Sequence, residues 1–166
     1  MMRLVVDSRE QTPFTFAGYD AEVQAGALTV GDYSLFGLTD RVAVERKSLA
    51  DLVLCLGRER ERFERELQRA AALSAFMVVV EAPWGDLASG NYRSQLNPNS
   101  ARQSVLAFTC RYRVPFMFAG TRAEAERMTF DYLRHYLRSA RERLKTLLRA
   151  HGDVPETGQQ KATLAY

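Results

Sequence analysis

The sequence predicts an α/β protein in which helices cover both faces of a mixed β-sheet. Short segments rich in β-branched and aromatic residues alternate along the chain with longer segments that carry apolar residues at helical spacing. The apolar run FMVVVEA at 76–82 is typical of a buried strand. Strands interspersed with helices in this way indicate one sheet that is packed on both sides.

The individual elements follow from turn residues and apolar spacing. Gly37 and the turn around Thr39 and Asp40 divide two β-rich segments, which predicts a hairpin over 32–47. The remaining expectations are strands at 3–8, 76–82 and 115–120, a loop with one short helix at 12–28, a helix from about 48, a loop at 83–99, and helices at 58–73, 100–113 and 122–149.

Length and composition predict one domain. With 166 residues and 46% hydrophobic content, residues 1–150 can bury one good core, while 151–166 have the composition of a flexible tail. The net charge is only +3, but every basic residue except Lys47, Lys145 and Lys161 is an arginine. Arginine suits the planar recognition of phosphate, so this bias points weakly to a phosphate-bearing partner.

Several function classes are disfavoured by what the sequence lacks. The N-terminal MMRLVVDSRE is charged and no apolar run is long enough to span a bilayer, so the protein is expected to be cytoplasmic, with no membrane partner, and nucleoid-associated if bacterial. Cys55 and Cys110 lie apart from each other and from His135 and His151, which predicts neither a zinc site nor a disulfide. The phosphate-binding GxxxxGK[ST] loop and the GxGxxG fingerprint are also missing, against an ATPase or a dinucleotide enzyme.

The stretch GDYSLFGLTDRVAVERKSLAD at 31–51 carries the chemical signal. Side chains alternate along a strand, so Glu45 and Lys47 share one face, and the hairpin partner can bring Asp32 to the same face. Two carboxylates suit Mg²⁺ or Mn²⁺, which binds a few acidic oxygens together with water and substrate phosphate. Lys47 would then orient or help to deprotonate a water that attacks a phosphodiester. Taken alone, the pattern also fits salt-bridged strand ends.

Three ordered motifs give the stretch a more specific meaning. VDSRE at 6–10, GDYSL at 31–35 and VERKSLADL at 44–52 resemble the motifs of the XPF/Hef structure-specific endonuclease family, whose signature runs GD, a gap, ERK, three residues and D. The resemblance extends from Arg3 to roughly Tyr136. It implies a restriction-endonuclease-like fold of the PD-(D/E)xK type and metal-dependent cutting of branched DNA.

The resemblance assigns roles to the motif residues. It implies that Asp32 and Glu45 hold Mg²⁺ or Mn²⁺ and that Lys47 works on the nucleophilic water. Asp7 and Glu10 would join the same catalytic cluster at the end of the first strand. The residues that would support this cluster, or contact phosphate beside it, are Arg9, Arg46, Asp51 and Arg62.

Three residues of the motifs also have a structural explanation. Asp51 stands three residues after Ser48, so its carboxylate can satisfy a free N–H at a helix start as part of a capping box. Gly31 can be explained by backbone geometry at the start of a strand. Asp7 can be an ordinary strand-end acid paired with Arg9, although its place among the three motifs favours the active-site interpretation.

Candidate DNA contacts lie outside the three motifs. Arg58, Arg62, Arg65 and Arg69 follow one face of a predicted helix, where the residues nearest the metal are candidates for DNA contact. Tyr92 and Arg93 lie in a long loop at 85–104 that can grip a displaced strand, although the loop is equally consistent with disorder. A second basic row runs along the last helix, where a solvated face and a phosphate-binding face are both consistent with its spacing: Arg134, Arg138, Arg141, Lys145 and Arg149.

The sequence therefore predicts a divalent-metal-dependent DNA endonuclease acting on branched, flap or nicked DNA in repair or recombination. The alternatives are a catalytically silent DNA-binding or scaffold subunit, and a sequence-specific restriction-type nuclease. Nothing after about residue 137 resembles the family's tandem helix-hairpin-helix domain. The resemblance therefore implies either a separate targeting partner or a homodimer formed near residues 101–118.

Overall fold

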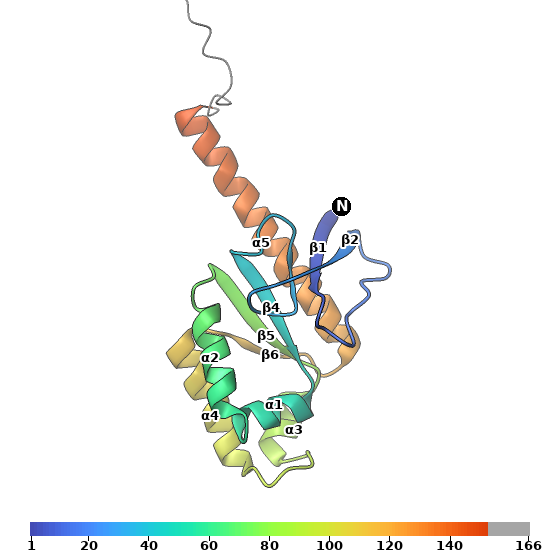
Figure 1. Ribbon diagram of the computed structural model, residues 1–166, viewed down its shortest axis with the longest axis vertical. Helices are drawn as coiled ribbons and strands as arrows, with labels where there is room; N and C mark the ends of the chain where they lie inside the picture. Colours follow the sequence, from blue (N-terminus) through green and yellow to red (C-terminus); the bar gives the residue numbers. More distant parts are fainter. Residues whose placement is uncertain (153–166) are drawn as a thin grey trace, which may run out of the picture.

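The computed structural model describes residues 1–152 (Figure 1). The elements follow the order β1 Met2–Asp7, β2 Ala21–Gly26, β3 Tyr33–Leu35, β4 Val42–Lys47, α1 Leu49–Leu56, α2 Arg60–Ala70, β5 Ala75–Val80, α3 Trp84–Ser89, α4 Pro98–Tyr112, β6 Phe116–Phe118 and α5 Arg122–His151. The tail predicted at 151–166 falls, from residue 153 on, outside the described residues.

The six strands form one mixed sheet in the order β2-β1-β3-β4-β5-β6. The predicted hairpin is confirmed, because β3 and β4 pair antiparallel with Tyr33 opposite Val44. β3 also pairs antiparallel with β1, whereas β1 and β2, β4 and β5, and β5 and β6 are parallel pairs. β1 and β4 therefore run in the same direction, and their carboxyl ends lie at the same edge of the sheet.

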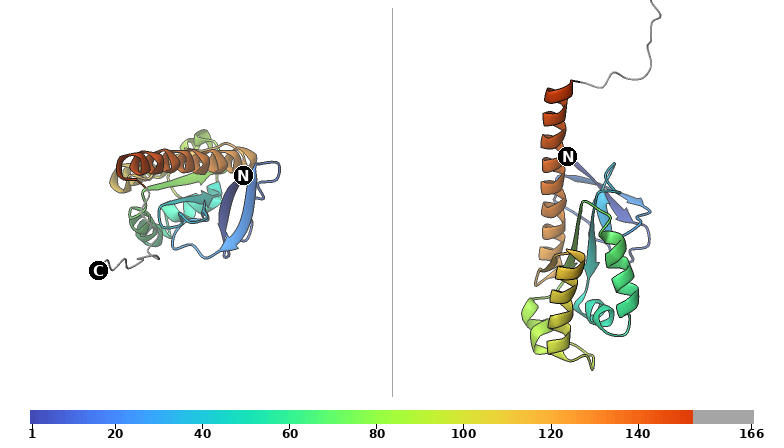
Figure 2. Two further views of the ribbon diagram at one scale, coloured as in Figure 1. Left: turned by 90° about the horizontal axis from the view of Figure 1, so that it is seen from above. Right: turned by 90° about the vertical axis from the view of Figure 1, so that its left-hand side faces the viewer.

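Each face of the sheet buries its own apolar core, as predicted. Val78 on β5 packs with Leu52, Phe63 and Phe108 from α1, α2 and α4. Its neighbour Val79 points to the other face and joins the core beneath α5. Figure 2 shows α5 along one face of the sheet, with α1 and α2 on the opposite face. Burial on both faces explains why β5 is a continuous apolar run.

Two predictions for the loops were wrong. The short helix expected within 12–28 is absent, and β2 at Ala21–Gly26 pairs parallel with β1 at the sheet edge instead. This segment has few β-branched or aromatic residues, so the pairing with β1, and not local propensity, makes it a strand. The loop expected at 83–99 contains the short helix α3, which ends at Gly90 in a left-handed conformation.

Helix α5 is longer than the sheet that it covers (Figure 1). Its first half is packed through Ala125, Thr129, Phe130 and Leu133, whereas residues 141–151 are exposed. Within residues 1–152, no helix is both long and apolar enough to cross a membrane.

Candidate active site

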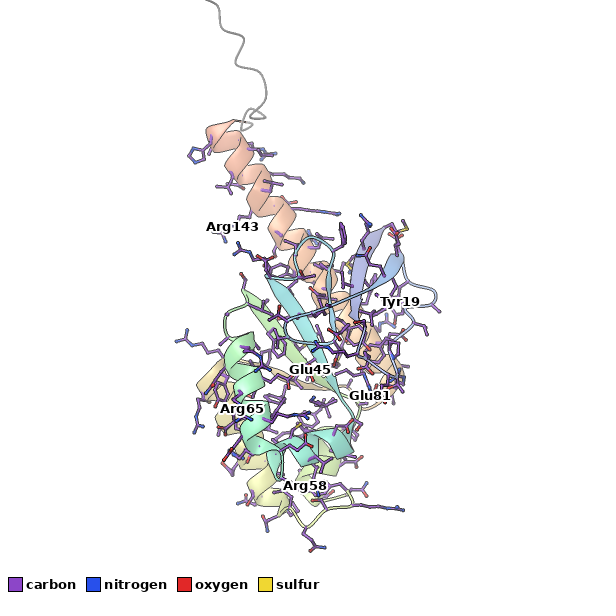
Figure 3. The ribbon with its side chains drawn as sticks, viewed as in Figure 1. Tyr19, Glu45, Arg58, Arg65, Glu81 and Arg143 are labelled. Carbon is purple, nitrogen blue, oxygen red and sulfur yellow. The ribbon has the colours of Figure 1, made fainter. Side chains whose placement is uncertain are left out.

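An open cavity of about 650 Å³ lies where β1 and β4 end and β3 begins, beside α1 and α2. Glu45, which lines this cavity, is labelled in Figure 3 near the middle of the molecule. Many of the residues predicted for the site line this cavity: Asp7, Arg9, Glu10, Asp32, Glu45, Arg46, Lys47, Asp51 and Arg62. Motifs that are far apart in the sequence are therefore brought to one place.

The Gly31–Asp32 pair is set by a close approach of two backbones. Gly31 has a φ of +79°, which residues with a side chain rarely adopt. A Cβ on Gly31 would lie 2.9 Å from the Ala43 Cβ and 3.1 Å from the Val44 carbonyl oxygen. The Asp32 amide donates to that carbonyl oxygen at 2.8 Å. Backbone geometry thus accounts for the glycine and holds Asp32 against β4.

Asp32 and Glu45 form a pair of desolvated carboxyl groups. Burial raises the pKa of Asp32 to about 6, although the Arg46 amide donates to its Oδ2 at 2.7 Å. Burial, followed by the neighbouring Asp32 charge, raises the pKa of Glu45 well above its usual value. The Glu66 carboxylate on α2 adds to both shifts. Acidic groups that resist ionising together form a site that a bound cation would stabilise.

Lys47 lies on the same face of β4 and donates to the Glu45 carboxylate. Burial lowers the pKa of Lys47, but nearby acidic groups, Glu45 foremost, outweigh burial and make the net shift upward. The amine therefore carries its proton at neutral pH. This protonated form can orient a water, and both roles predicted for Lys47, orienting the water and helping to deprotonate it, stay predictions.

Asp7 ends β1 with both carboxylate oxygens engaged by the protein. Its Oδ1 accepts from the Arg9 amide and the Arg9 Nε, both at 2.8 Å, and its Oδ2 accepts from the Leu28 amide at 2.8 Å. The Arg9 guanidinium also donates to the Leu28 carbonyl at 2.7 Å. Asp7 thus ties the VDSRE segment to the segment before Gly31. A direct part in catalysis stays a prediction for Asp7.

Replacing Asp7 by asparagine is expected to lower the free energy of unfolding by about 2 kcal/mol at pH 7. The hydrogen bonds from Arg9 lower the pKa of Asp7 to about 2 despite burial, below the value of about 3.9 for an unfolded chain. The stabilisation by the Asp7 carboxylate is therefore present above pH 4 and is lost as the pH falls towards 2. Urea unfolding of wild type and variant at pH 7, 4 and 2.5 measures this stabilisation. A difference in unfolding free energy that stayed constant over this range would contradict the structural role of the carboxylate.

Arg46 points to the opposite face of β4 from Glu45 and Lys47, and it is almost buried. Its guanidinium contacts Glu10 at 3.1 Å and Glu81 at 3.2 Å, and donates to the Thr12 hydroxyl at 2.8 Å. Glu81, directly after β5, is shared with Arg122 at 2.7 Å. The ion pairs of Arg46 and Glu81 thus connect β4, the loop after β1 and the start of α5.

Asp51 lies in the first turn of α1, where Ser48 is the N-cap. The Asp51 amide donates to the Ser48 hydroxyl at 3.1 Å, and that hydroxyl donates to the Asp51 Oδ2 at 2.7 Å. The Asp51 carboxylate thus accepts from a hydroxyl and not from the helix N–H that the capping-box interpretation predicted. The side chain is exposed and also lines the cavity, and catalytic support stays a prediction.

Helix α2 forms one wall of the cavity. Arg62, Glu66 and Arg69 line this wall at i, i+4 and i+7 spacing, which places them on one helical face. Arg58 and Arg65, both labelled in Figure 3, do not line it. DNA contact stays a prediction for all four arginines, but only Arg62 and Arg69 stand beside the carboxylates.

Tyr92 and Arg93 belong to a different part of the surface. They line a smaller cavity of about 390 Å³ together with Leu49 and Val53 of α1. The Tyr92 hydroxyl donates to the Leu96 carbonyl at 3.0 Å, and the ring packs against the core beneath α1 and α2. The structure does not bring these two residues to the carboxylates, and strand gripping by them stays a prediction.

The profile of the ERCC4 domain matches residues 6–132, which is most of the chain. The chain belongs to the ERCC4 domain family.

Among solved structures, XPF from Aeropyrum pernix has a TM-score of 0.67 and 22% identity, over 94% of this chain and 75% of that one. The same protein in complex with DNA has a TM-score of 0.66 and 22% identity, over 84% and 66%. No curated protein gives a significant match. The predicted fold is confirmed.

Three residues of this ERCC4 domain lie in or against the site but were not singled out for it from the sequence: Glu66 lines the cavity, and Glu81 and Arg122 contact residues that line it. The position of Glu66, four residues after Arg62, is a signal that could have identified it, because it is on the same helical face. Glu81 is a charged residue that ends an apolar strand, which is a weaker signal. No feature of the neighbouring sequence indicates a role for Arg122, because its hydrogen bonds are with residues at least 41 positions away.

The donor set of this ERCC4 domain fits a divalent cation such as Mg²⁺ or Mn²⁺. Asp32 and Glu45 offer oxygen ligands, and each has part of its carboxylate free of protein hydrogen bonds. Across residues 1–152, no group of three or more acidic, histidine or cysteine side chains forms a complete metal cage. A site of two carboxylates leaves room for water and substrate phosphate, as Mg²⁺ usually requires.

Proposed function

We propose that this ERCC4 domain is a divalent-metal-dependent DNA endonuclease that hydrolyses phosphodiester bonds in branched, flap or nicked DNA. The observation that carries the proposal is the meeting of Asp32, Glu45 and Lys47 in one open cavity, although 13 or more positions separate Asp32 from the other two. The membership in the ERCC4 family and the fold shared with XPF from Aeropyrum pernix, which has also been solved in complex with DNA, support it.

The roles of the residues follow from their charge and surroundings. A bound Mg²⁺ or Mn²⁺ would polarise the scissile phosphate and lower the pKa of a water beside it. Asp32 and Glu45 would hold that ion because burial makes their charges costly without a cation. The Lys47 ammonium would orient the attacking water and oppose the negative charge that develops on phosphorus oxygens. The expected products carry a 5′-phosphate and a 3′-hydroxyl.

The cationic rim supports DNA as the substrate. Arg9 and Arg69 are exposed at the mouth of the cavity, where their side chains can reach phosphates on either side of the cleaved bond. Arg62 stands on the same wall as Arg69. A homodimer near residues 101–118 remains a further proposal, supported by exposed Leu106 on α4 and Met117 on the edge strand β6.

The direct test is cleavage of end-labelled flap, fork and plain duplex DNA with Mg²⁺ or Mn²⁺ at low and moderate salt, with Asp32→Asn as the matched inactive variant. Cutting confined to branched DNA, and lost in the variant, is the expected result. Discrete fragments from linear plasmid would indicate a sequence-specific nuclease instead. Binding without cleavage in either metal would favour a silent scaffold subunit and overturn the proposal.

A further inference from the structure

We propose that the basic row along α5, formed by Arg134, Arg138, Arg141, Lys145 and Arg149, binds the phosphate backbone of a duplex arm that extends from the cleavage site. This inference rests on the proposed function, because it places the arm relative to the catalytic cavity. The row lies outside that cavity and has no part in the chemistry described above.

The charge of this part of α5 is strongly one-sided. Residues 134–149 contain six basic residues and one acidic residue, Glu142, which is paired with Lys145 at 3.0 Å. Arg134 is paired with Asp131 at 2.8 Å. Within residues 1–152, Arg138, Arg141 and Arg149 have no ion pair of their own. The row therefore keeps uncompensated positive charge, whereas many surface charges in proteins are balanced by neighbours.

The row also forms the wall of a groove. A cavity of about 620 Å³ lies between α5 and the start of β1, with Tyr19 and Phe130 in contact at its floor and Arg134, Arg138, Arg141 and Lys145 along its side. Among residues 1–152, the acidic groups that line the cavity are Asp20, paired with the Met1 amine, and Glu142. The groove is thus an exposed concave surface with a basic wall.

The position of α5 connects this surface to the catalytic cavity. Arg122, at the first turn of α5, donates to the carbonyl oxygens of Thr12 and Pro13, and Thr12 lines the cavity. At 1.5 Å per residue, Arg134 lies about 18 Å and Arg149 about 40 Å along the helix from Arg122. With about 3.4 Å per base pair, a duplex arm beside α5 would meet the row roughly 5 to 12 base pairs from the cleavage site.

Charge decides between DNA and a second copy of the chain as the occupant. Two copies that paired through this row would bring like charges together, which is unfavourable. The exposed leucines on this part of α5 are Leu144, Leu147 and Leu148. At about 100° per residue, Leu144 and Leu147 lie well away from the row, and Leu148 alone of the three lies beside it, so the row offers a protein partner little apolar surface. Arginine-rich surfaces match the charge and geometry of phosphates.

The chain offers a matched control on the same helix. Arg143 projects from the side of α5 opposite to the row, because successive residues are turned by about 100°. Figure 3 shows Arg143 on the left of the helix, away from the β1 side on which the groove lies. Arg138→Gln with Arg141→Gln changes the net charge by −2 on the row, and Arg143→Glu makes the same change on the opposite side. All three residues are exposed, so the helix should form in each variant.

The test measures the salt dependence of binding to two flap substrates, with no metal and therefore no cleavage. One substrate has duplex arms of about 20 base pairs, and the other has hairpin-closed arms of about 5 base pairs, which end before the row. The double variant is expected to reduce the slope of log K against log salt by about 1.8 on the long arms and to leave the short-arm slope unchanged. Arg143→Glu should cause at most a third of that change.

Several results would overturn the inference. Equal changes in slope for the double variant and Arg143→Glu would show a general charge effect, and equal changes on both substrates would show that arm length is irrelevant. A change in oligomeric state by light scattering, with unchanged DNA binding, would assign the row to a protein partner. Failure of the proposed function would look different, because the slopes would behave as expected while metal addition produced no cleavage.

Discussion

Asp32→Asn is expected to abolish metal-dependent DNA cleavage, by at least about 10³-fold, and at the same time to make the metal-free protein more stable at pH 8 by about 2 kcal/mol. The loss of activity follows from the loss of a charged metal ligand. The gain in stability follows because the amide keeps an oxygen that accepts from the Arg46 amide, while the cost of a buried charge disappears.

The sign of the pH dependence distinguishes this prediction from a general effect of mutation. The pKa of Asp32 is about 6 in the folded protein, above the value of about 3.9 in an unfolded chain. The protonated Asp32 carboxyl therefore contributes its full stabilisation below pH 4, and this stabilisation is lost as the pH rises through 6 and the buried group ionises. The amide of the variant does not ionise, so the unfolding free energies of the two proteins should be similar near pH 4 and should diverge by pH 8.

Urea unfolding in EDTA at pH 4.5, 6 and 8 measures the stability, and Mn²⁺-induced shifts in melting temperature measure metal binding. Wild-type protein should gain stability from Mn²⁺, increasingly so as the pH rises through 6, and the variant should gain little. Glu22→Gln, an exposed change on β2, is the control and should behave as wild type. An Asp32→Asn protein that is less stable than wild type at pH 8, or that still cleaves, would refute the account of this carboxylate.

Gly31→Ala is expected to lower the free energy of unfolding by about 3 kcal/mol. The added Cβ would meet the Ala43 Cβ at 2.9 Å, the Val44 carbonyl oxygen at 3.1 Å and a Phe76 ring carbon at 3.3 Å. Two of these neighbours belong to the central strand β4 and cannot move without disturbing Glu45. Loss of cleavage should accompany the loss of stability, because Asp32 is the next residue.

Gly37→Ala separates steric overlap from backbone strain. Gly37 has a φ of +78°, close to that of Gly31, but an added Cβ there would meet no atom within 4 Å. Only the strain of the left-handed conformation remains, so the expected loss is about 1 kcal/mol. Urea unfolding of both variants at pH 7 compares them directly, and equal losses would mean that the close approach to β4 does not constrain Gly31.

The sequence predicted the layered sheet and the ERK strand well because both have local signals. Alternation and turn residues gave the hairpin, and the apolar run gave β5. β2 could not be predicted, because Ala21–Gly26 becomes a strand only through pairing with β1. The same limit applies to the site. The motifs gave Asp32 and Glu45, whereas Arg122 is explained only by three-dimensional contacts with Glu81 and the loop after β1.

The alternation of side chains along β4 constrains how this chain can vary in length. Glu45 and Lys47 project towards α1 and α2, and Arg46 projects towards α5. A single residue inserted between Val42 and Glu45 would exchange the two faces, so that Glu45 would project into the layer of α5 and Arg46 would project towards α1 and α2 in its place. The exposed turn at 37–41 has no such restriction. Insertions and deletions should therefore be tolerated at the hairpin turn and excluded from β4, where the number of residues is as important as their identity.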